Sequence, residues 1–396
     1  MGNWKTCTIA DLGMVVGGAT PSTKEAENYD GGTIAWITPK DLAGYSERFI
    51  SHGERDITET GLHSCSAQMM PRHSVLFSSR APIGYVAIAE NELCTNQGFK
   101  SVVPNENTDY MFLYYLLLNN RQRIEHMGSG TTFKEVSGKT MRSIEVRVPE
   151  SKEEQIRISS ILSTIDDKIE ENERINKNLQ AQAQAVFLHL FADNESVIPA
   201  SIADVALNVT DGVHNTVHDD PDGEYLLLSC KNIKGGSLSI GTSERRINAE
   251  TFEKLRRRTK LAKGDVLISS VGTVGELLLV NTEPSNYEFQ RSVAMVKPNP
   301  DIVSPVYLYE ALLSQKAELI NAAHGAVQQC LFISDIAGFP IGIPTQDDLL
   351  TFDEVVTPMF DTITANEEES IRLAALRDAL LPKLMSDEID VSDLDL

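Results

Sequence analysis

A long stretch with a seven-residue apolar period, from Lys152 to Phe191, constrains the fold of this chain more than any other feature. An uninterrupted helix of this length is about 60 Å long. The periodic series is apolar apart from one asparagine and consists of Ile158, Ile165, Asn172, Leu179 and Val186. A series of this kind is typical of a coiled-coil seam, so it predicts a partner helix.

A second periodic stretch near the carboxyl end supplies that partner. Each member lies 194 positions after a member of the first series, and an asparagine again stands in the middle: Phe352, Met359, Asn366, Leu373 and Leu380. A polar residue in a seam costs stability but fixes the alignment of the helices. We therefore expect Asn172 and Asn366 to meet near the centre of an antiparallel coiled coil. The alternative is two surface helices that pack separately, each on its own domain.

The same offset links the rest of the chain, which indicates an internal duplication. Segments 36–42, 75–84 and 146–149 return in the same order, at offsets between 191 and 195, as segments 227–233, 266–275 and 341–344. Gln97 and Gln290 likewise precede corresponding strands. Each half is of ordinary size for a globule with a long helix. The predicted parts are a first globule at 1–150, a helix at 151–193, a second globule at 194–344, a helix at 345–385 and an acidic tail at 386–396.

Both globules mix short strands with one clear helix, so we predict the α+β class for each. In the first globule the predicted helix is 110–124, and the predicted strands are 4–12, 34–37, 75–78, 85–89, 99–103 and 144–148. In the second, the predicted helix is 305–323, with strands at 225–228 and 293–296 and a hairpin around 272–275. Glycine-rich or polar loops are predicted at 16–21, 128–134 and 324–329.

Composition favours a cytoplasmic protein. The five cysteines are scattered without a C-x-x-C pair, so they indicate neither a disulfide framework nor a zinc knuckle. No apolar run approaches the roughly 20 residues needed to cross a bilayer, and residues 1–4 lack the pattern of a signal peptide. We expect a soluble chain with no membrane partner.

The net charge of −22 argues at first against a nucleic-acid partner, because a polyanion is bound by local cations. Half of that charge, however, lies in residues 345–396, which hold 14 acidic and three basic residues. One basic cluster stands out, with three acids among its neighbours: Arg245, Arg246, Lys254, Arg256, Arg257, Arg258, Lys260 and Lys263. Such a cluster is either a solvated face or a nucleic-acid-binding patch.

No segment carries the residues of a catalytic site. Residues 136–140 resemble the end of a P-loop, but Phe133 stands where that motif requires glycine, so we exclude ATP binding there. The chain has no Pro-Pro pair, which excludes the Asn/Asp-Pro-Pro-aromatic motif of amino-methyltransferases. His214 and His218 stand four residues apart, but in a loop and not on a helix face, so a metal site is the less favoured interpretation. We expect no catalytic residue, metal or cofactor in this chain.

A duplicated non-catalytic globule on stiff helices is suited to binding an extended ligand at two places, and DNA is such a ligand. One face of its major groove recurs about every 34–36 Å. Arg, Lys, Gln, Asn, Ser and Thr side chains on loops bind base edges. We predict DNA contacts for Thr38, Lys40, Arg80, Gln97, Thr131, Lys134, Lys231, Asn232, Arg256, Arg257, Arg258, Thr273, Gln290, Arg291, Gln328 and Gln329. For any one of them, a solvated loop residue or a turn cap is an equal alternative.

The sequence resembles the specificity subunits of type I restriction-modification enzymes. The resemblance rests on segments 36–42, 78–84 and 96–99, and above all on 149–179 with its Glu153-Glu154-Gln155-Ile156 opening. It implies two target recognition domains, each of which reads one half of a bipartite site in double-stranded DNA. It also implies that the long helices set the spacing of the half-sites and dock two methyltransferase subunits that carry S-adenosylmethionine. Restriction subunits would add ATP- and Mg²⁺-dependent translocation and cleavage.

The second long helix departs from the pattern of the first. It opens with Gln346-Asp347-Asp348 instead of Glu-Glu-Gln, and Pro358 near its start predicts a kink or a late beginning. Two other classes of function stay open. One is a non-catalytic scaffold whose globules bind proteins, which the acidic balance favours. The other is an enzyme that acts without partner subunits, for which we expect no activity.

Overall fold

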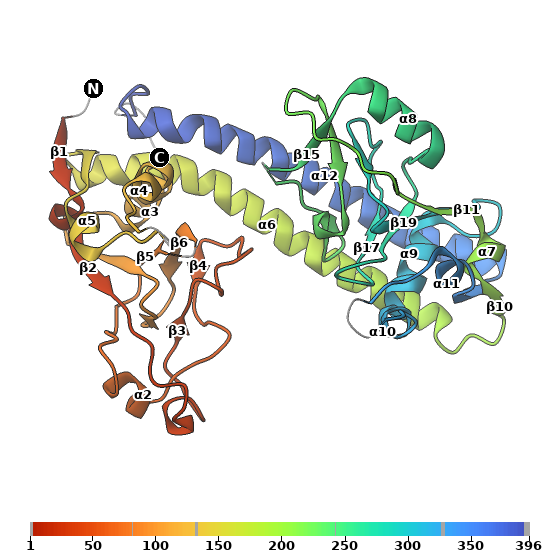
Figure 1. Cartoon of the computed structure of the whole chain (residues 1–396), viewed down its shortest axis with the longest axis horizontal. Coiled ribbons are helices and arrows are strands. Elements are labelled where there is room, and N and C mark those ends of the chain that lie inside the picture. The colour runs from red at the N-terminus through yellow and green to blue at the C-terminus, as the bar shows by residue number, and fades with distance from the viewer. Residues whose placement is uncertain (1–2, 81, 131–133, 242, 326–328, 392–396) are drawn as a thin grey trace. The chain divides into compact units, whose positions relative to one another are not determined.

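The computed structural model describes residues 3–80, 82–130, 134–241, 243–325 and 329–391. The chain divides into two compact units (Figure 1). Unit 1 comprises residues 1–171 and 370–396, and unit 2 comprises residues 172–369. Two 40-residue helices, α6 (Lys152–Phe191) and α12 (Gln346–Met385), pass from one unit to the other. Each unit is therefore a globule packed on a part of both helices.

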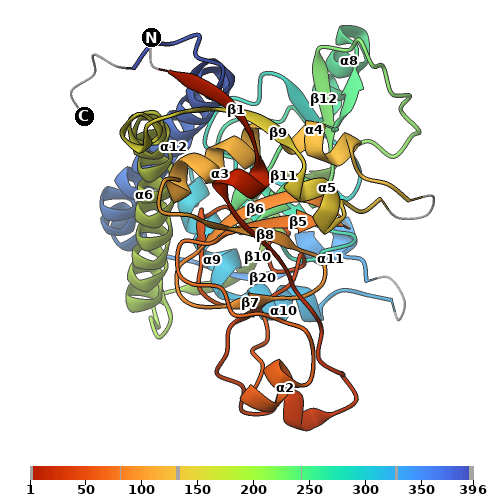
Figure 2. The ribbon, with the colours of Figure 1, turned by 90° about the vertical axis from the view of Figure 1, so that its left-hand side faces the viewer.

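Unit 1 contains an α+β globule. Its elements are β1 (Trp4–Thr8), α1 (Ile9–Leu12), β2 (Gly13–Gly17), η1 (Ala26–Asn28), β3 (Trp36–Ile37), β4 (Phe49–Ile50), α2 (Glu59–His63), β5 (Val75–Ser79), β6 (Ile83–Ala89), β7 (Cys94–Thr95), β8 (Lys100–Pro104), α3 (Tyr110–Asn119), α4 (Arg121–His126), α5 (Gly138–Arg142) and β9 (Glu145–Pro149). The main sheet has the order β2-β8-β5-β6-β4, and β1-β9 and β3-β7 form separate pairs. Helices α3 and α4 lie against β5 and β6, whereas α2 lies at the end of the globule away from them (Figure 2). The main core of the unit lies between this sheet, α3 and the two long helices.

Unit 2 repeats this plan with local differences. Its elements are β10 (Ile198–Ser201), α7 (Ile202–Val205), β11 (Ala206–Asp211), β12 (Tyr225–Leu228), η2 (Cys230–Asn232), β13 (Ile233–Lys234), β14 (Ser237–Leu238), β15 (Arg245–Ile247), α8 (Ala249–Thr259), β16 (Val266–Ser269), β17 (Leu277–Leu279), β18 (Tyr287–Phe289), β19 (Val293–Pro298), α9 (Pro305–Ser314), α10 (Lys316–Asn321), α11 (Ile333–Ala337) and β20 (Pro340–Ile343). The order β11-β19-β16-β17 matches β2-β8-β5-β6, and the parallel pair β12-β18 matches β3-β7. Helix α8 follows β15, packs on β18 and is a longer counterpart of α2, since Asn248 and Thr58 cap the two helices in the same way.

The duplication extends to individual hydrogen bonds. The hydroxyl of Ser78, in β5, donates to the carbonyl of Pro82 and accepts from the amide of Tyr85, both at 2.8 Å. In unit 2 the hydroxyl of Ser269 makes the same two bonds, to the carbonyl of Thr273 and from the amide of Glu276. Both hairpins therefore turn around a serine hydroxyl, as expected of two copies of one scaffold.

The predicted helices 110–124 and 305–323 are each divided in two. Asn120 separates α3 from α4, and its side-chain amide donates to the carbonyl of Leu116 at 2.8 Å. Gln315 separates α9 from α10, and its amide donates to the carbonyl of Ala311 at 3.2 Å. In both cases a side-chain amide donates to a carbonyl in the last turn of the first helix, where backbone donors run out.

Three strand and loop boundaries also differ from the predictions. The strand predicted at 4–12 ends at Thr8, because Thr8 and Asp11 form a capping box that begins α1. The loop predicted at 16–21 begins later, since β2 continues to Gly17. The strand predicted at 34–37 is reduced to β3, which pairs with β7. The remaining predicted strands lie at or within two residues of observed ones.

The late start predicted for the second long helix is wrong. Helix α12 begins at Gln346 and continues through Pro358 to Met385. A proline inside a helix removes one backbone hydrogen bond. Phe352, Val356 and Phe360 are buried in the core of unit 2 on either side of the proline, and this packing holds the helix in place. No helix within the described ranges combines the length and the apolar character needed to cross a membrane.

Within each unit, α6 and α12 contact one another. In unit 1, Ile158 and Leu162 of α6 belong to the same buried cluster as Leu381, Leu384 and Met385 of α12. In unit 2, the amide of Asn172 donates to the carbonyl of Asn366 at 3.4 Å, and the amide of Asn366 donates to the side chain of Asn176 at 2.8 Å. The two asparagines therefore meet as predicted. Ile158, Ile165, Asn172 and Phe352 are buried, and the other predicted seam residues are partly buried: Leu179, Val186, Met359, Asn366, Leu373 and Leu380.

Candidate nucleic-acid interface

Three loops of unit 1 meet at one end of the main sheet and carry the predicted residues Arg80, Gln97 and Lys134. The amide of Ser79 donates to the carbonyl of Gly98 at 2.7 Å, which places the loop after β7 beside the end of β5. Arg80 and Ser129 both form a β-bridge with Glu135, which brings the loop before α5 to the same place. Thr131, predicted in that loop, lies outside the described residues.

Thr38 and Lys40 lie beside this group of loops. A side chain at Gly98 would meet the ring of Pro39 at 2.7 Å, so the loop after β3 packs on the loop that carries Gln97. Thr38 is half-buried and donates its hydroxyl to Asp41 at 2.7 Å. Lys40 pairs with Glu54 at 2.6 Å, and both side chains are mostly exposed. The hydrogen bond and charge of Glu54 raise the pKa of Lys40.

Unit 2 gathers the corresponding loops around a cavity of about 480 Å³. Gln290 and Arg291 line it together with Phe332 and His214. β-Bridges from Cys330 to Val271 and to His324 bring the loop of Gln329 to the end of β16. Thr273 and Gln329 are exposed, and Gln328 lies outside the described residues.

A neighbouring depression of about 340 Å³ also adjoins Gln290 and is lined by Lys231 and Arg245. Lys231 forms an ion pair of 2.9 Å with Glu244. Asn232 is 1% exposed, and its side chain bonds to the amide of Ser229 and the carbonyl of Ser239. It therefore holds its own loop together and offers nothing to a ligand.

The three arginines of α8 have different environments. Arg256 donates through Nε to Glu288, which is fully buried, and through Nη2 to the carbonyls of Pro284 and Tyr287. Burial raises the pKa of Glu288, and the hydrogen bond from Arg256 opposes that rise. Arg257 and Arg258 are both exposed, but Arg258 donates to the carbonyl of Gly212. Of the three, Arg257 is the one that no such bond to the described residues holds.

Thr20 and His214 were missed by the sequence prediction. The hydroxyl of Thr20 donates to the side-chain carbonyl of Gln97, and His214 contacts Asp211 at 2.5 Å. Each follows a glycine by two residues, and a side chain on either glycine would overlap backbone carbonyls of the loop opposite. Those paired glycines are the signal that could have revealed them. Among the described residues, no group of His, Cys, Asp and Glu side chains with His214 or elsewhere has the arrangement of a metal site.

The predicted correspondence of Gln97 with Gln290 is wrong by one residue. The amide of Asn96 donates to the carbonyl of Ile37 at 2.9 Å, and the equivalent bond in unit 2 runs from the amide of Gln290 to Leu228 at 2.8 Å. Gln97 therefore corresponds to Arg291. The two units present different side chains, an amide and a guanidinium, at this position of the loop.

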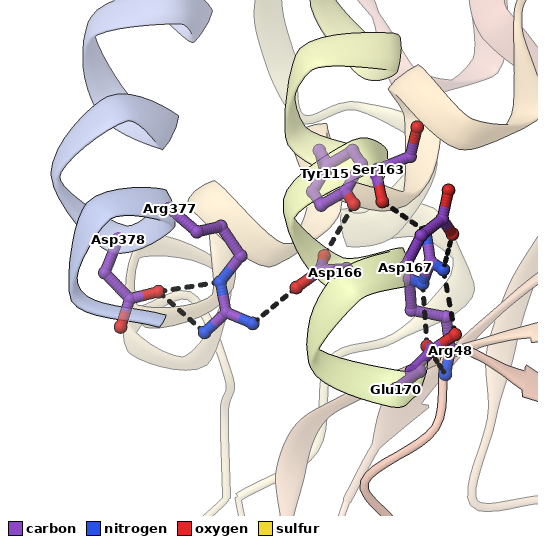
Figure 3. A network of polar contacts seen from close by, with 8 residues as sticks. All are labelled: Arg48, Tyr115, Ser163, Asp166, Asp167, Glu170, Arg377 and Asp378. Atoms are coloured by element: carbon purple, nitrogen blue, oxygen red, sulfur yellow. Dashed lines mark hydrogen bonds and ion pairs between the residues drawn. The ribbon is translucent and has the colours of Figure 1, made fainter. Parts of the chain in front are cut away.

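A polar network joins the globule of unit 1 to α6 (Figure 3). Arg48 is 4% exposed, and both its Nε and its Nη2 donate to Glu170 at 2.8 Å. It donates further to Asp167 and to the carbonyl of Ser163, the latter at 3.4 Å. Burial disfavours the arginine charge, but the hydrogen bonds that Arg48 donates to Glu170 and Asp167 raise its pKa overall.

A second branch of this network begins at Asp166, one turn before Glu170 on α6. Tyr115 of α3 donates its hydroxyl to Asp166 at 2.6 Å, and Arg377 of α12 donates to the other oxygen of the same carboxylate at 2.7 Å (Figure 3). Burial and the charge of Asp166 raise the pKa of Tyr115, so the phenol stays a hydrogen-bond donor. One carboxylate of α6 thus joins the globule of unit 1 to both long helices.

Comparison with known proteins identifies the family. A family model described as "Type I restriction modification DNA specificity domain" matches residues 1–181. The chain is 35% identical over 423 residues to the type I restriction enzyme MjaIX specificity subunit of Methanocaldococcus jannaschii, covering 99% of this chain and 95% of that protein. It is 28% identical over 169 residues to the EcoR124I/EcoR124II specificity subunit of Escherichia coli, covering 41% of this chain and 40% of that protein.

A solved structure shares the fold. The S subunit of a type I restriction-modification system from M. genitalium has a TM-score of 0.57 at 16% identity, covering 97% of this chain and 96% of that one. Similarity to the Methanocaldococcus protein extends over almost the full length of both chains. The chain therefore belongs to the family of type I restriction enzyme specificity subunits.

Proposed function

We propose that this chain is the DNA sequence-recognition subunit of a type I restriction-modification complex and that each globule reads one half of a bipartite target. The observation that carries the proposal is the recurrence of the same loop cluster at the same end of each main sheet. Different side chains occupy corresponding positions in the two clusters, such as Gln97 and Arg291. A duplicated scaffold with unlike loops is suited to two unlike half-sites.

The proposed contacts fall into two groups. Residues of the first loop cluster read one half-site, and we assign to them Thr38, Lys40, Arg80, Gln97, Thr131 and Lys134. Residues of the second cluster read the other, and we assign to them Lys231, Arg257, Thr273, Gln290, Arg291, Gln328 and Gln329. Arginine and glutamine side chains suit guanine and adenine edges, and lysine suits phosphate. Asn232, Arg256 and Arg258 hold the fold of the second globule instead.

The long helices have a separate task in this proposal. They pair as an antiparallel coiled coil that sets the distance between the half-sites, with Asn172 and Asn366 fixing its alignment. Their exposed faces dock two methyltransferase subunits, and restriction subunits complete the complex. S-adenosylmethionine, ATP and Mg²⁺ belong to those partners, and this chain supplies no catalytic group.

Methylome sequencing of cells that carry the intact operon tests the proposal, because it reports the modified site directly. We expect one bipartite sequence with a spacer of constant length. Exchange of residues 1–150 for those of another family member should change one half-site and leave the other. A change in both half-sites would contradict the assignment of one globule to each.

The alternative is a scaffold whose globules bind proteins, which the net charge of −22 favours. Filter binding of DNA to the assembled complex over a salt series separates the two functions. A DNA-reading subunit loses affinity steeply as salt rises, because phosphate contacts release counterions. Absence of DNA binding at low salt would support the scaffold.

A further inference from the structure

We propose that Arg48 is a positioning residue that determines which spacer lengths the first globule accepts in the DNA target. The inference rests on the proposed function, because a spacer exists only where two half-sites are read. Arg48 touches no loop that is assigned to DNA. It acts through the attachment of the globule to α6.

The backbone of Arg48 belongs to the main sheet of unit 1. Its carbonyl accepts a hydrogen bond of 2.7 Å from the amide of Ile88 in β6, and β4 begins at the next residue. Strand β6 pairs with β5, at whose end Arg80 lies. Any rotation of Arg48 against α6 would therefore move the sheet that carries the proposed DNA-binding loops.

The side chain of Arg48 fixes the sheet to α6 at several points. Two guanidinium nitrogens donate hydrogen bonds to Glu170, and the backbone amide of Arg48 donates a third to the same carboxylate at 3.2 Å. Asp167 accepts a further hydrogen bond from the guanidinium (Figure 3). A planar guanidinium bound at two nitrogens resists rotation, whereas a single ammonium would act as a pivot. The arginine is almost fully buried, so salt screens this pair weakly.

Unit 2 holds its globule differently. In its described part, the main sheet has no strand in the place of β4. Ser237, the first residue of β14, reaches α12 through its hydroxyl, which donates to Glu367 at 3.1 Å. A hydroxyl donates to the helix here, whereas Arg48 donates several hydrogen bonds from a charged guanidinium. Arg48 therefore adds a charged attachment of the first globule to α6, beside the contacts of Tyr115 and Ser159.

A change in spacer length requires the first globule to move and turn relative to α6. One added base pair moves a half-site by about 3.4 Å along the DNA and turns it by about 34°. A globule fixed to α6 cannot follow that rotation, so sites with a longer or shorter spacer are rejected. A globule whose attachment is loosened by the loss of Arg48 can follow it further while its loops still bind the same bases.

The experiment is methylome sequencing of cells that carry the intact operon with Arg48→Ala in this subunit. We expect the same two half-sites and about tenfold more methylation at sites whose spacer is one base pair longer or shorter. The double variant Asp167→Asn/Glu170→Gln removes the two carboxylate charges of α6 that pair with Arg48, and it should give the same result. Arg48→Lys should fall between Arg48→Ala and the wild type. Arg72→Ala, at an exposed arginine of the same unit, is the matched control and should keep the wild-type pattern.

Two results would overturn the inference. One is methylation confined to the original spacer in both Arg48→Ala and the double variant. The other is loss of methylation at every site in Arg48→Ala, Arg48→Lys and the double variant, which would make Arg48 a residue needed for folding. A change in the half-site bases would likewise overturn it, because Arg48 would then be a base-reading residue. Failure of the proposed function looks different, because the wild-type operon itself would then give no bipartite methylated sequence.

Discussion

Ser159 of α6 donates a hydrogen bond of 2.9 Å to the carboxylate of Asp109, the residue that caps α3. Unit 2 contains the same contact with the residue types exchanged. There Ser304 caps α9 and donates at 2.6 Å to Asp353 of α12. Both arrangements supply one hydroxyl, one carboxylate and one helix cap. The two halves have kept the bond between globule and long helix although its residues differ.

This exchange predicts the behaviour of variants in unit 1. Ser159→Asp places a second carboxylate against Asp109 and should destabilise the unit by about 1–3 kcal/mol, because the hydrogen bond is lost and like charges meet. The double variant Asp109→Ser/Ser159→Asp recreates the arrangement of unit 2 and should recover most of that loss. Thermal unfolding measures both, with about 2–4 °C for each kcal/mol. A double variant no more stable than Ser159→Asp would show that the two pairs are not equivalent.

Arg256 and Arg257 are neighbours in sequence with opposite expected roles. Arg256→Ala leaves the buried carboxylate of Glu288 without its ion pair and should cost about 3–5 kcal/mol of stability in unit 2. Arg257→Ala removes an exposed cation and should leave thermal unfolding unchanged. If Arg257 contacts phosphate, its loss should lower the slope of log affinity against log salt by about one. Both variants are checked by thermal unfolding and by DNA binding of the assembled complex. If Arg257→Ala lowered the stability and left DNA binding unchanged, the DNA-binding role of Arg257 would be refuted.

Pro358 lies on the exposed face of α12, in the interior of the helix. Alanine at this position restores a backbone donor and removes the clash of the ring with the preceding turn. We therefore expect Pro358→Ala to stabilise unit 2, by at most about 3 kcal/mol. Asp361→Ala, an exposed substitution less than one turn later, should give a much smaller shift in the unfolding midpoint. Equal shifts for the two variants would mean that the proline imposes no local strain.

The long helices could be predicted from the sequence because their information is local and repeated. An apolar period over 40 residues has few structural solutions, and α6 begins and ends at the predicted residues. The asparagines at 172 and 366 could be paired because each interrupts an otherwise apolar series. The correspondence of the two globules could likewise be predicted, because similar segments recur in the same order at a nearly constant offset.

The attachment of the first globule to α6 through Arg48 could not be predicted in this way. Arg48 and Glu170 are 122 residues apart. Glu170 lies in the long periodic helix but outside its apolar series, so the period does not mark it as a partner of Arg48. Asn232 is of a residue type that binds ligands from loops, and only the fold shows that it is buried. The one-residue error at Gln97 arose because loops of unequal length separate the matched strands. Contacts made by single side chains over long distances leave no pattern in one sequence.

Glu310 gives unit 2 a predicted dependence on pH. Its side chain is fully buried in α9, and neither carboxylate oxygen has a hydrogen-bond partner in the described part of the chain. Burial raises its pKa to about 8 from an ordinary value of 4.5. Between these values the folded state keeps a proton that the unfolded chain releases. The stability of unit 2 should therefore fall as pH rises from about 4.5 to about 8 and should level off above that, with a change of up to about 4–5 kcal/mol.

Glu310→Gln tests this dependence because it keeps the size of the side chain and removes its charge. We expect the variant to unfold near the wild-type temperature at pH 5 and several degrees above it at pH 8, since the unfolded variant gains nothing by ionisation. Glu318→Gln, on the neighbouring α10 and exposed, is the matched control and should keep the wild-type profile at both pH values. Thermal unfolding over this pH range would contradict the assignment if Glu310→Gln and the wild type changed in parallel. The corresponding residue of unit 1 is Tyr115, which donates to Asp166, so unit 1 should lack this acid-dependent gain in stability.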